Sequence, residues 1–319
     1  MTEIPLPFRV SSTDNPVDIL TFAASAVQRG GAALATLVEI RGGAARALGA
    51  QVAIAADGGF VGYVSGGCVD AAVAAEALHA IADGRDRFAK FGEGSAFFDI
   101  VIPCGGGITV SIHILRGDEV LHTVLGEIAE RRSVALAYSS RLQKLAPCNT
   151  HLQSSDWQGE EFVSVYHPQL RLVISGQRGE VEAVRRLAEA AGYAVSLSDP
   201  HKTPRGQSSD VIDPFTAVVL LHHDLDLEAD LLNEALASSA FYIGALGSTR
   251  THRRRLERLM AIGVSSESCD RIKAPIGMFG PARDATTLAL SVLADIAVAR
   301  LTLFHDQYSV EMNWKPPRR

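Results

Sequence analysis

The run Ala217–Leu221 is an unbroken stretch of apolar residues, and it constrains the fold of the chain more than any other feature. Such a run is typical of a strand that is covered on both faces, as in a parallel sheet. Shorter strand-like segments at Leu172–Ser175 and Ala194–Leu197 alternate with segments of helical apolar spacing. This alternation of strands and helices predicts a Rossmann-like, doubly wound parallel sheet in the second half of the chain.

The first half has a different pattern. Strand and hairpin signals dominate there, for example around the Asp57-Gly58 turn, and residues 139–168 are polar and irregular. A chain of 319 residues is long enough for two domains. We therefore predict an α/β protein with an N-terminal mixed α+β domain over residues 1–168, followed by a Rossmann-like parallel-sheet domain over residues 169–319.

Composition and charge exclude several classes of protein. The net charge of −6 gives no basic footprint of the kind that nucleic-acid binders carry. The first residues lack the pattern of a signal peptide, and the most apolar segment, 286–304, contains Asp295 and Arg300, which a membrane-spanning helix rarely holds. The four cysteines are too far apart for a zinc ribbon and suit a reducing compartment. We expect a cytoplasmic protein with no nucleic-acid or membrane partner.

Two glycine-rich loops in the first half each carry a thiol. They are Ser65-Gly66-Gly67-Cys68 and Cys104-Gly105-Gly106. Glycine lets backbone amides approach a ligand closely, successive amides can bind an anion, and nearby dipoles favour a thiolate. On physical grounds alone, two tight turns that bury small cysteines explain the same residues better.

The sequence resembles the XdhC/CoxI family through three signatures in order along the chain. They are Val38 to Asp70 with Gly62-Tyr63-Val64-Ser65-Gly66-Gly67-Cys68, then Pro103-Cys104-Gly105-Gly106, then Phe241–Ser248 with Arg250-Thr251-His252. The resemblance implies an accessory protein that binds molybdenum cofactor as cargo and supports its sulfuration by a cysteine desulfurase. Such a protein then supports insertion of the cofactor into a xanthine-dehydrogenase-type molybdenum hydroxylase. It would be a carrier or chaperone rather than a turnover enzyme, and relatives often form homodimers.

This resemblance gives the first-half loops a role. A carrier needs amide donors for the cofactor phosphate and a sheltered pocket for the rest. The candidate cofactor-binding residues there are Ser65, Gly66, Gly67, Cys68, Cys104, Gly105 and Gly106. We hypothesise that Cys68 or Cys104 contacts the cofactor molybdenum or helps to relay sulfur.

The phosphate loop of the predicted Rossmann-like domain is altered. Gly176 matches the first glycine of the GxGxxG pattern, but Arg178 occupies the second position and Val181 the third. Arg178 would crowd the loop amides, although its guanidinium group can itself hold a phosphate. Asp199 stands near the position expected of a ribose-binding acid, and the Asp199-Pro200 pair fits a strand terminator equally well. With Gly176, Arg178 and Asp199 as the candidate contacts, we expect NAD(P) binding to be weak or absent.

A third candidate site begins at the Gly247-Ser248 loop. Ser248 is a natural N-cap, and Arg250 and His252 follow in the first helical turn, where an anion would be stabilised. A solvated helix face explains these two residues about equally well. The further arginines of this helix are predicted to lie on a solvated face; they are Arg253, Arg255 and Arg258.

His223 and Asp224 are the candidate catalytic residues. They follow the strand Ala217–Leu221, and the carboxyl ends of parallel strands form the usual ligand crevice. They fit an acid/base pair, or equally a helix cap beside a solvent-facing imidazole. Two other functions stay open: an NAD(P)-binding oxidoreductase, against which the altered phosphate loop argues, and an interaction scaffold of the same fold that binds no cofactor.

Overall fold

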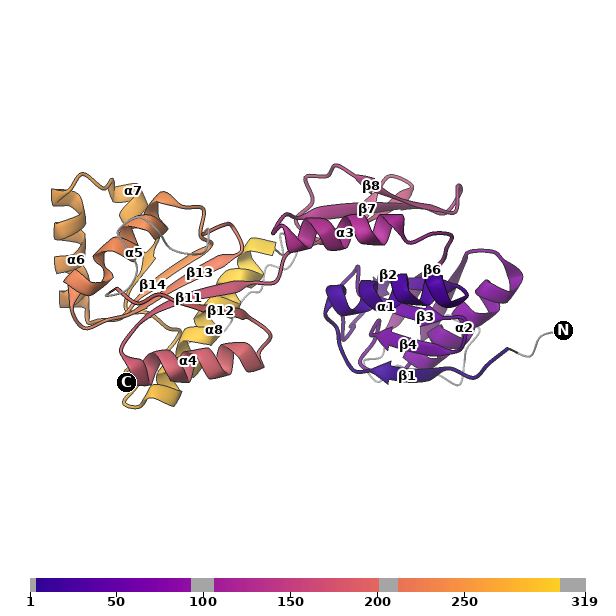
Figure 1. The fold of residues 1–319 in the computed structure, drawn as a ribbon, viewed down its shortest axis with the longest axis horizontal. Helices are drawn as coiled ribbons and strands as arrows, with labels where there is room; N and C mark the ends of the chain where they lie inside the picture. The colour runs from indigo at the N-terminus through magenta and orange to yellow at the C-terminus, as the bar shows by residue number, and fades with distance from the viewer. Residues whose placement is uncertain (1–3, 93–105, 201–211, 305–319) are drawn as a thin grey trace. The chain divides into compact units, whose positions relative to one another are not determined.

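The computed structural model describes residues 4–92, 106–200 and 212–304 (Figure 1). The chain divides into two units, Met1–Pro168 and Gln169–Arg319, and each is described by itself.

A six-stranded sheet forms the centre of the first unit. Its order is β1 (Phe8–Ser11), β4 (Gly59–Gly62), β3 (Gln51–Ala55), β2 (Ala32–Arg41), β6 (Gly107–Leu115) and β5 (Arg87–Gly92). β1 pairs with β4 in parallel, and the other neighbours are antiparallel. The β3–β4 hairpin turns at Asp57-Gly58, where Asp57 Oδ1 accepts a hydrogen bond from the Gly59 amide at 3.0 Å.

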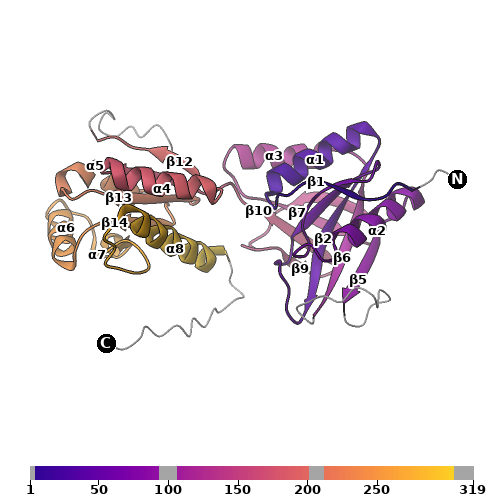
Figure 2. The ribbon, with the colours of Figure 1, turned by 90° about the horizontal axis from the view of Figure 1, so that it is seen from below.

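Three helices cover the two faces of this sheet (Figure 2). α2 (Asp70–Asp83) packs on one face, where Ile54, Phe60 and Val73 belong to the same core. α1 (Pro16–Arg29) and α3 (Glu119–Ala129) share the core of the other face. α1 begins at Pro16 because the Asn15 side chain accepts a hydrogen bond from Val17 N at 2.9 Å, and proline suits the first helical position.

A second, antiparallel sheet follows in the same unit. Its order is β8 (Lys144–Cys148), β7 (Val134–Ser139), β10 (Glu161–Tyr166) and β9 (Asp156–Gln158). The prediction that residues 139–168 are irregular is therefore wrong. Leu136 and Tyr166 belong to the core shared with α1 and α3, whereas every residue of β8 is partly or fully exposed. β8 also contains Pro147, which argues against a strand when the sequence is considered alone.

A parallel sheet forms the centre of the second unit, in the order β12 (Ala194–Leu197), β11 (Arg171–Gly176), β13 (Thr216–Leu221), β14 (Tyr242–Ala245) and β15 (Ile272–Lys273). Every pairing in it is parallel, and β13 is buried along its whole length. The predicted Rossmann-like sheet is confirmed. The strand order reverses between β11 and β13, which is where open α/β sheets bind ligands.

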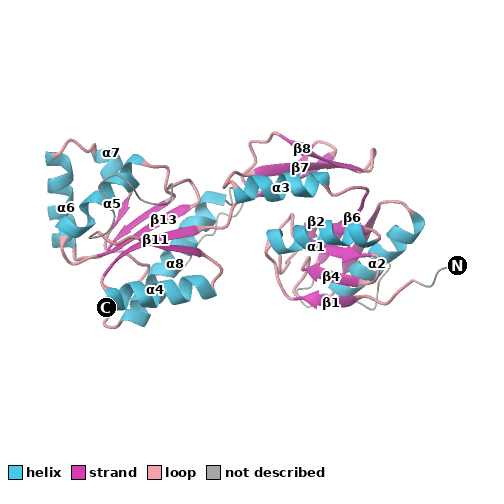
Figure 3. Ribbon diagram, in the orientation of Figure 1, coloured by secondary structure: helices cyan, strands magenta, loops and turns pink. Residues whose placement is uncertain are grey.

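Helices lie on both faces of the parallel sheet (Figure 3). α4 (Arg178–Ala190) and α8 (Ala285–Phe304) pack on one face. α5 (Leu225–Ala237), α6 (Thr249–Ala261) and the short α7 (Ser266–Cys269) contribute to the core of the other.

α8 is the one helix in the described ranges that is long and apolar enough to cross a membrane by composition. Its Ala289, Val292 and Ile296 are fully buried in the core of the second unit. Asp295 on the same helix accepts a hydrogen bond of 2.7 Å from the Tyr242 hydroxyl. These contacts are those of a helix that closes a globular core.

Candidate functional site

The loops that carry the candidate residues of the first unit lie at one end of the strands of the six-stranded sheet. β2 ends at Arg41, which pairs with Gly107 at the start of β6, and β4 ends at the same end of the sheet. The loop 42–50 connects β2 to β3, the Ser65–Cys68 loop follows β4, and Gly106 precedes β6. Cys104 and Gly105 lie outside the described residues.

The loop 42–50 contacts both glycine-rich segments. A Cβ on Gly66 would lie 3.4 Å from Ala45 Cβ, and a Cβ on Gly106 would lie 2.6 Å from Gly43 O. Gly106 thus has to be a glycine, because backbone atoms occupy the space of a side chain. The structure therefore brings Gly66 and Gly106 against a single connecting loop.

Ser65 and Asp70 fix the shape of the Ser65–Cys68 loop. Asp70 Oδ1 accepts hydrogen bonds from Val64 N (3.1 Å), Ser65 N (3.0 Å) and the Ser65 hydroxyl (3.0 Å), and both side chains are buried. Ser65 Oγ in turn accepts from Gly67 N and Val69 N, each at 3.2 Å. Ser65 therefore holds the loop, which turns at Gly67 with a φ of 110°.

Cys68 is exposed at the tip of this loop, so the interpretation of a buried small cysteine is wrong for this thiol. α2 begins at Asp70, two residues further on, and its N-cap residue, Val69, has an apolar side chain that makes no capping hydrogen bond. Backbone N–H groups at a helix N-terminus favour a nearby negative charge. The thiol and the start of α2 therefore present a sulfur ligand beside an anion-favouring helix terminus.

Arg9, Arg41 and Arg46 lie at this end of the sheet. The Arg9 and Arg46 guanidinium groups lie 4.1 and 5.3 Å from the centre of the Tyr63 ring. Arg41 donates to Glu39 Oε2 at 2.7 Å and to the Thr109 hydroxyl at 2.9 Å. The hydrogen bond from Thr109, together with the charge of Arg41, holds the pKa of the Glu39 carboxyl below its usual value. Sequence reasoning missed Arg9 and Arg46, because only the fold places them beside Tyr63.

The altered phosphate loop joins β11 to α4. A Cβ on Gly176 would lie 2.5 Å from Leu221 Cβ, so this glycine is required by the close approach of β13. Arg178 is the first residue of α4 and is exposed, and Glu180 lies in the same first turn. Asp199 follows β12 and is partly buried.

A buried Ser175–His222 pair lies at the ligand-binding end of the parallel sheet. Ser175 Oγ and His222 Nε2 are 2.8 Å apart, at or beyond the carboxyl ends of β11 and β13. No role for either residue was predicted from the sequence.

His223 and Asp224 have separate roles in the structure. Asp224 Oδ1 accepts a hydrogen bond from Asp226 N at 3.0 Å and so caps α5. His223 is exposed, with its Nε2 3.7 Å from Glu180 Oε1. This arrangement is a helix cap beside a surface imidazole.

The basic helix α6 is only partly solvated. Ser248 caps it by accepting from Thr251 N at 3.3 Å, after a turn at Gly247 with a φ of 131°, and Arg250 is exposed. Burial, with the charge of Arg255, lowers the pKa of the His252 imidazole.

The predicted solvated face is wrong for Arg255, which is 2% exposed. Its Nε and NH2 donate to the two carboxylate oxygens of Glu228 at 2.5 and 3.1 Å, and NH2 also donates to Leu246 O at 2.8 Å. A buried guanidinium group needs such partners, and α5 supplies them from a distant part of the sequence. Arg258, by contrast, pairs with Asp226 at the surface.

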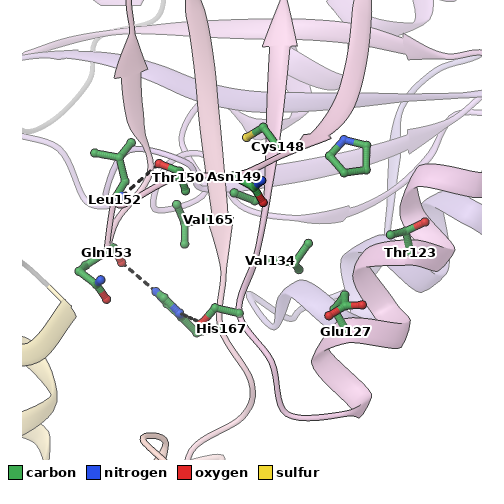
Figure 4. A pocket seen from close by; sticks show the side chains of 13 residues that line it. Thr123, Glu127, Val134, Cys148, Asn149, Thr150, Leu152, Gln153, Val165 and His167 are labelled. Carbon is green, nitrogen blue, oxygen red and sulfur yellow. Dashed lines mark hydrogen bonds between the residues drawn. The ribbon is translucent and has the colours of Figure 1, made fainter.

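A cavity of about 520 Å³ lies over β7, β8, β10 and α3 (Figure 4). Burial and the charge of Glu161 raise the pKa of the Cys148 thiol that lines it. His167 Nε2 donates to Gln153 O at 2.8 Å, and its Nδ1 lies 2.8 Å from the Ser133 hydroxyl. The ring is thus engaged on both nitrogens, and none of the candidate residues from the sequence lines this cavity.

Comparison with known proteins gives two family matches. Residues 26–92 match the model described as the XdhC and CoxI family, and residues 172–296 match the XdhC Rossmann domain. The chain is 47% identical over 296 residues to the molybdenum cofactor insertion chaperone PaoD of Escherichia coli (strain K12), covering 92% of each protein. It is 27% identical over 271 residues to the uncharacterized protein YqeB of the same organism, covering 83% of this chain and 42% of YqeB.

A solved structure described as a xanthine dehydrogenase from Bacillus halodurans shares the fold. The TM-score is 0.72 at 19% identity, covering 92% of this chain and 98% of that one.

Proposed function

The chain belongs to the XdhC and CoxI family, and from this membership we propose that it binds molybdenum cofactor as cargo and delivers it to a molybdenum hydroxylase. The 47% identity to an insertion chaperone over 92% of the chain supports a carrier role. In this role the cofactor is bound and released without being turned over, so the protein needs a binding site and no catalytic group.

The exposed Cys68 thiol is the observation that carries the proposal. The cargo offers a metal held by a dithiolene, a pterin and a phosphate. A thiolate is a soft ligand suited to such a metal, and Gly66 and Gly67 allow backbone amides to come close to the cargo. The N-terminus of α2 favours the negatively charged end of the cargo. Cys104 and Gly105 precede Gly106, which packs against the same loop 42–50, and we assign them to the same site.

The proposal also covers sulfuration of the cofactor, the client enzyme, the cellular location and the oligomeric state. The carrier presents the cofactor for sulfuration to a cysteine desulfurase, and its client is a xanthine-dehydrogenase-type enzyme. We place the protein in the cytoplasm, as a homodimer. The free thiols of Cys68, Cys148 and Cys269 support a reducing compartment.

NAD(P) is not part of this proposal. Arg178 stands at the start of α4 where a dinucleotide fold needs a glycine, and Glu180 adds a negative charge to the same turn. The separate placement of His223 and Asp224 likewise supports a carrier over a turnover enzyme.

The test is anaerobic purification of the full chain from cells that make molybdenum cofactor, followed by analysis of bound molybdenum and oxidised pterin. We expect both in the wild type and at least several-fold less in Cys68→Ala. Cys148→Ala is the matched control, because Cys148 is also a free thiol but lies on β8, and it should retain the wild-type content. A wild-type protein that carries neither metal nor pterin would refute the carrier role.

A further inference from the structure

Arg46 lies beside the loop that carries the exposed thiol. Its neighbour Ala45 packs against Gly66, with 3.4 Å between Ala45 Cβ and the position of a Cβ on that glycine. The Arg46 guanidinium group lies 5.3 Å from the centre of the Tyr63 ring. Tyr63 leads through one residue into Ser65–Cys68, so the guanidinium group is placed at the site proposed for the cargo.

Arg46 has donors that the protein itself leaves unused. Its NH1 lies 3.3 Å from Asp14 Oδ2, and the Asp14 side chain is 69% exposed, so this ion pair contributes little stability. Its Nε is buried and finds no hydrogen-bond acceptor within residues 4–92, 106–200 and 212–304. A buried donor without an acceptor is costly, so the protein holds this conformation of the Arg46 side chain only weakly, and the side chain can turn toward an acceptor that a ligand brings.

Arg9 and Arg41, the other two arginines at this end of the sheet, donate hydrogen bonds to partners within the protein. Arg9 donates to Gly62 O at 2.8 Å and to the buried Asp70 carboxylate at 3.0 Å. Arg41 donates to Glu39, to the Thr109 hydroxyl and to Ile108 O. Releasing Arg9 would leave the buried Asp70 carboxylate without this donor, and releasing Arg41 would do the same to the buried Thr109 hydroxyl. Arg46 only has to leave the exposed Asp14.

The charges near α2 also favour an anion at Arg46. Asp70 is the acidic residue in the first turn of α2, but its carboxylate turns back to accept from Ser65 and is paired with Arg9. The negative charge of Asp70 is thus compensated within the protein. The positive charge of Arg46 and the amides at the start of α2 remain to attract an incoming anion.

We propose that Arg46 binds the phosphate monoester of the cargo, and that Asp14 holds the guanidinium group in the cargo-free protein. The planar fork of arginine matches phosphate oxygens, and a phosphate with nearly two negative charges displaces a single exposed carboxylate. This assignment rests on the proposed function, since it takes the phosphate from the molybdenum cofactor. It assigns phosphate recognition to the first unit rather than to the altered loop of the Rossmann-like unit.

The test compares two ligands on the full chain: molybdopterin with its phosphate, and the same pterin after enzymatic removal of the phosphate. Dissociation constants are measured anaerobically by fluorescence quenching for the wild type, Arg46→Ala and Arg85→Ala. Arg85 is the matched control, because it is exposed beyond the opposite end of α2. Arg46→Ala should bind the phosphorylated pterin about 10- to 100-fold more weakly and the dephosphorylated pterin unchanged, and Arg85→Ala should change neither.

Asp14→Asn should act in the opposite direction. It removes the competitor for Arg46, so it should tighten binding of the phosphorylated pterin about two- to fivefold, a result that misfolding cannot produce. Equal losses for both pterins in Arg46→Ala, or no loss, would overturn the assignment of Arg46 and leave the carrier role intact. A wild-type chain that binds neither pterin would overturn both.

Discussion

Ser175 Oγ and His222 Nε2 lie 2.8 Å apart in the buried end of the parallel sheet. Ser175 lies on β11 and His222 directly follows β13. These two strands flank the point where the strand order reverses, which is where nucleotide-binding folds have their ligand crevice. In this chain a pair of hydrogen-bonded side chains stands at that position. We therefore expect the pair to compete with a dinucleotide for the space and the polar atoms at this end of the sheet.

We expect the wild-type chain to bind NAD or NADP only with a dissociation constant weaker than about 1 mM. Arg178→Gly restores one glycine of the phosphate loop, but it leaves Glu180 in the first turn of α4 and the Ser175–His222 pair in place. Its affinity should therefore stay as weak. Titration calorimetry measures both proteins, and micromolar affinity of the wild type would contradict the prediction.

Arg255→Met should lower the free energy of unfolding by about 3–5 kcal/mol, because it leaves the Glu228 carboxylate buried and unpaired. Arg253→Met is the matched control on the same helix. Arg253 is exposed, so the change should stay within about 0.5 kcal/mol. Urea unfolding followed by circular dichroism gives these values.

The double variant Glu228→Leu with Arg255→Met separates the loss of a charge partner from the loss of packing. It should recover most of the stability, since both buried charges are gone. A double variant that is less stable than Arg255→Met would show that packing, and not the unpaired carboxylate, causes the loss.

The sequence predicted the fold best where a run of neighbouring residues by itself shows that a strand is buried. β13 is apolar at nearly every position because it is covered on both faces, and the parallel sheet follows from that run. The strands β8 and β9 were missed because β8 contains Pro147, which argues against a strand in sequence, and β9 has only three residues.

Residues whose role depends on a distant partner were beyond sequence reasoning. Arg255 belongs to a run of charges that is typical of a solvated face, and only Glu228 on α5 shows that it is buried. Arg46 and Arg9 are brought to Tyr63 by the loop 42–50 and by β1. The exposure of Cys68 depends in the same way on the hydrogen bonds between Ser65 and Asp70.

Asp86 should make the first unit sensitive to acid. Burial alone would raise the pKa of its carboxyl, but His113 Nδ1 at 2.6 Å and the Ile114 amide at 3.0 Å outweigh burial and lower that pKa. A lowered pKa in the folded state stabilises the protein above the pKa of the unfolded state, about 4. This contribution is lost as the pH falls through the folded-state value.

Asp86→Asn should therefore flatten the fall of unfolding free energy below about pH 4, as measured by urea unfolding at several pH values. Asp270→Asn, at an exposed position, is the control and should leave the wild-type dependence unchanged. The same steep acid loss in Asp86→Asn and in the wild type would assign the dependence to other groups.

Gly106→Ala should disturb the loop 42–50 directly. The added Cβ would lie 2.6 Å from Gly43 O, so the loop must shift, and we expect a loss of about 1–3 kcal/mol in unfolding free energy. The same shift moves Ala45 relative to Gly66, so bound molybdenum and pterin should fall as well. Gly126→Ala is the control, because Gly126 lies within α3 with open space around its Cβ position. Alanine there should raise the unfolding free energy by about 0.5–1 kcal/mol and keep the cargo. Full cargo content in Gly106→Ala, at reduced stability, would show that the loop 42–50 takes no part in the site.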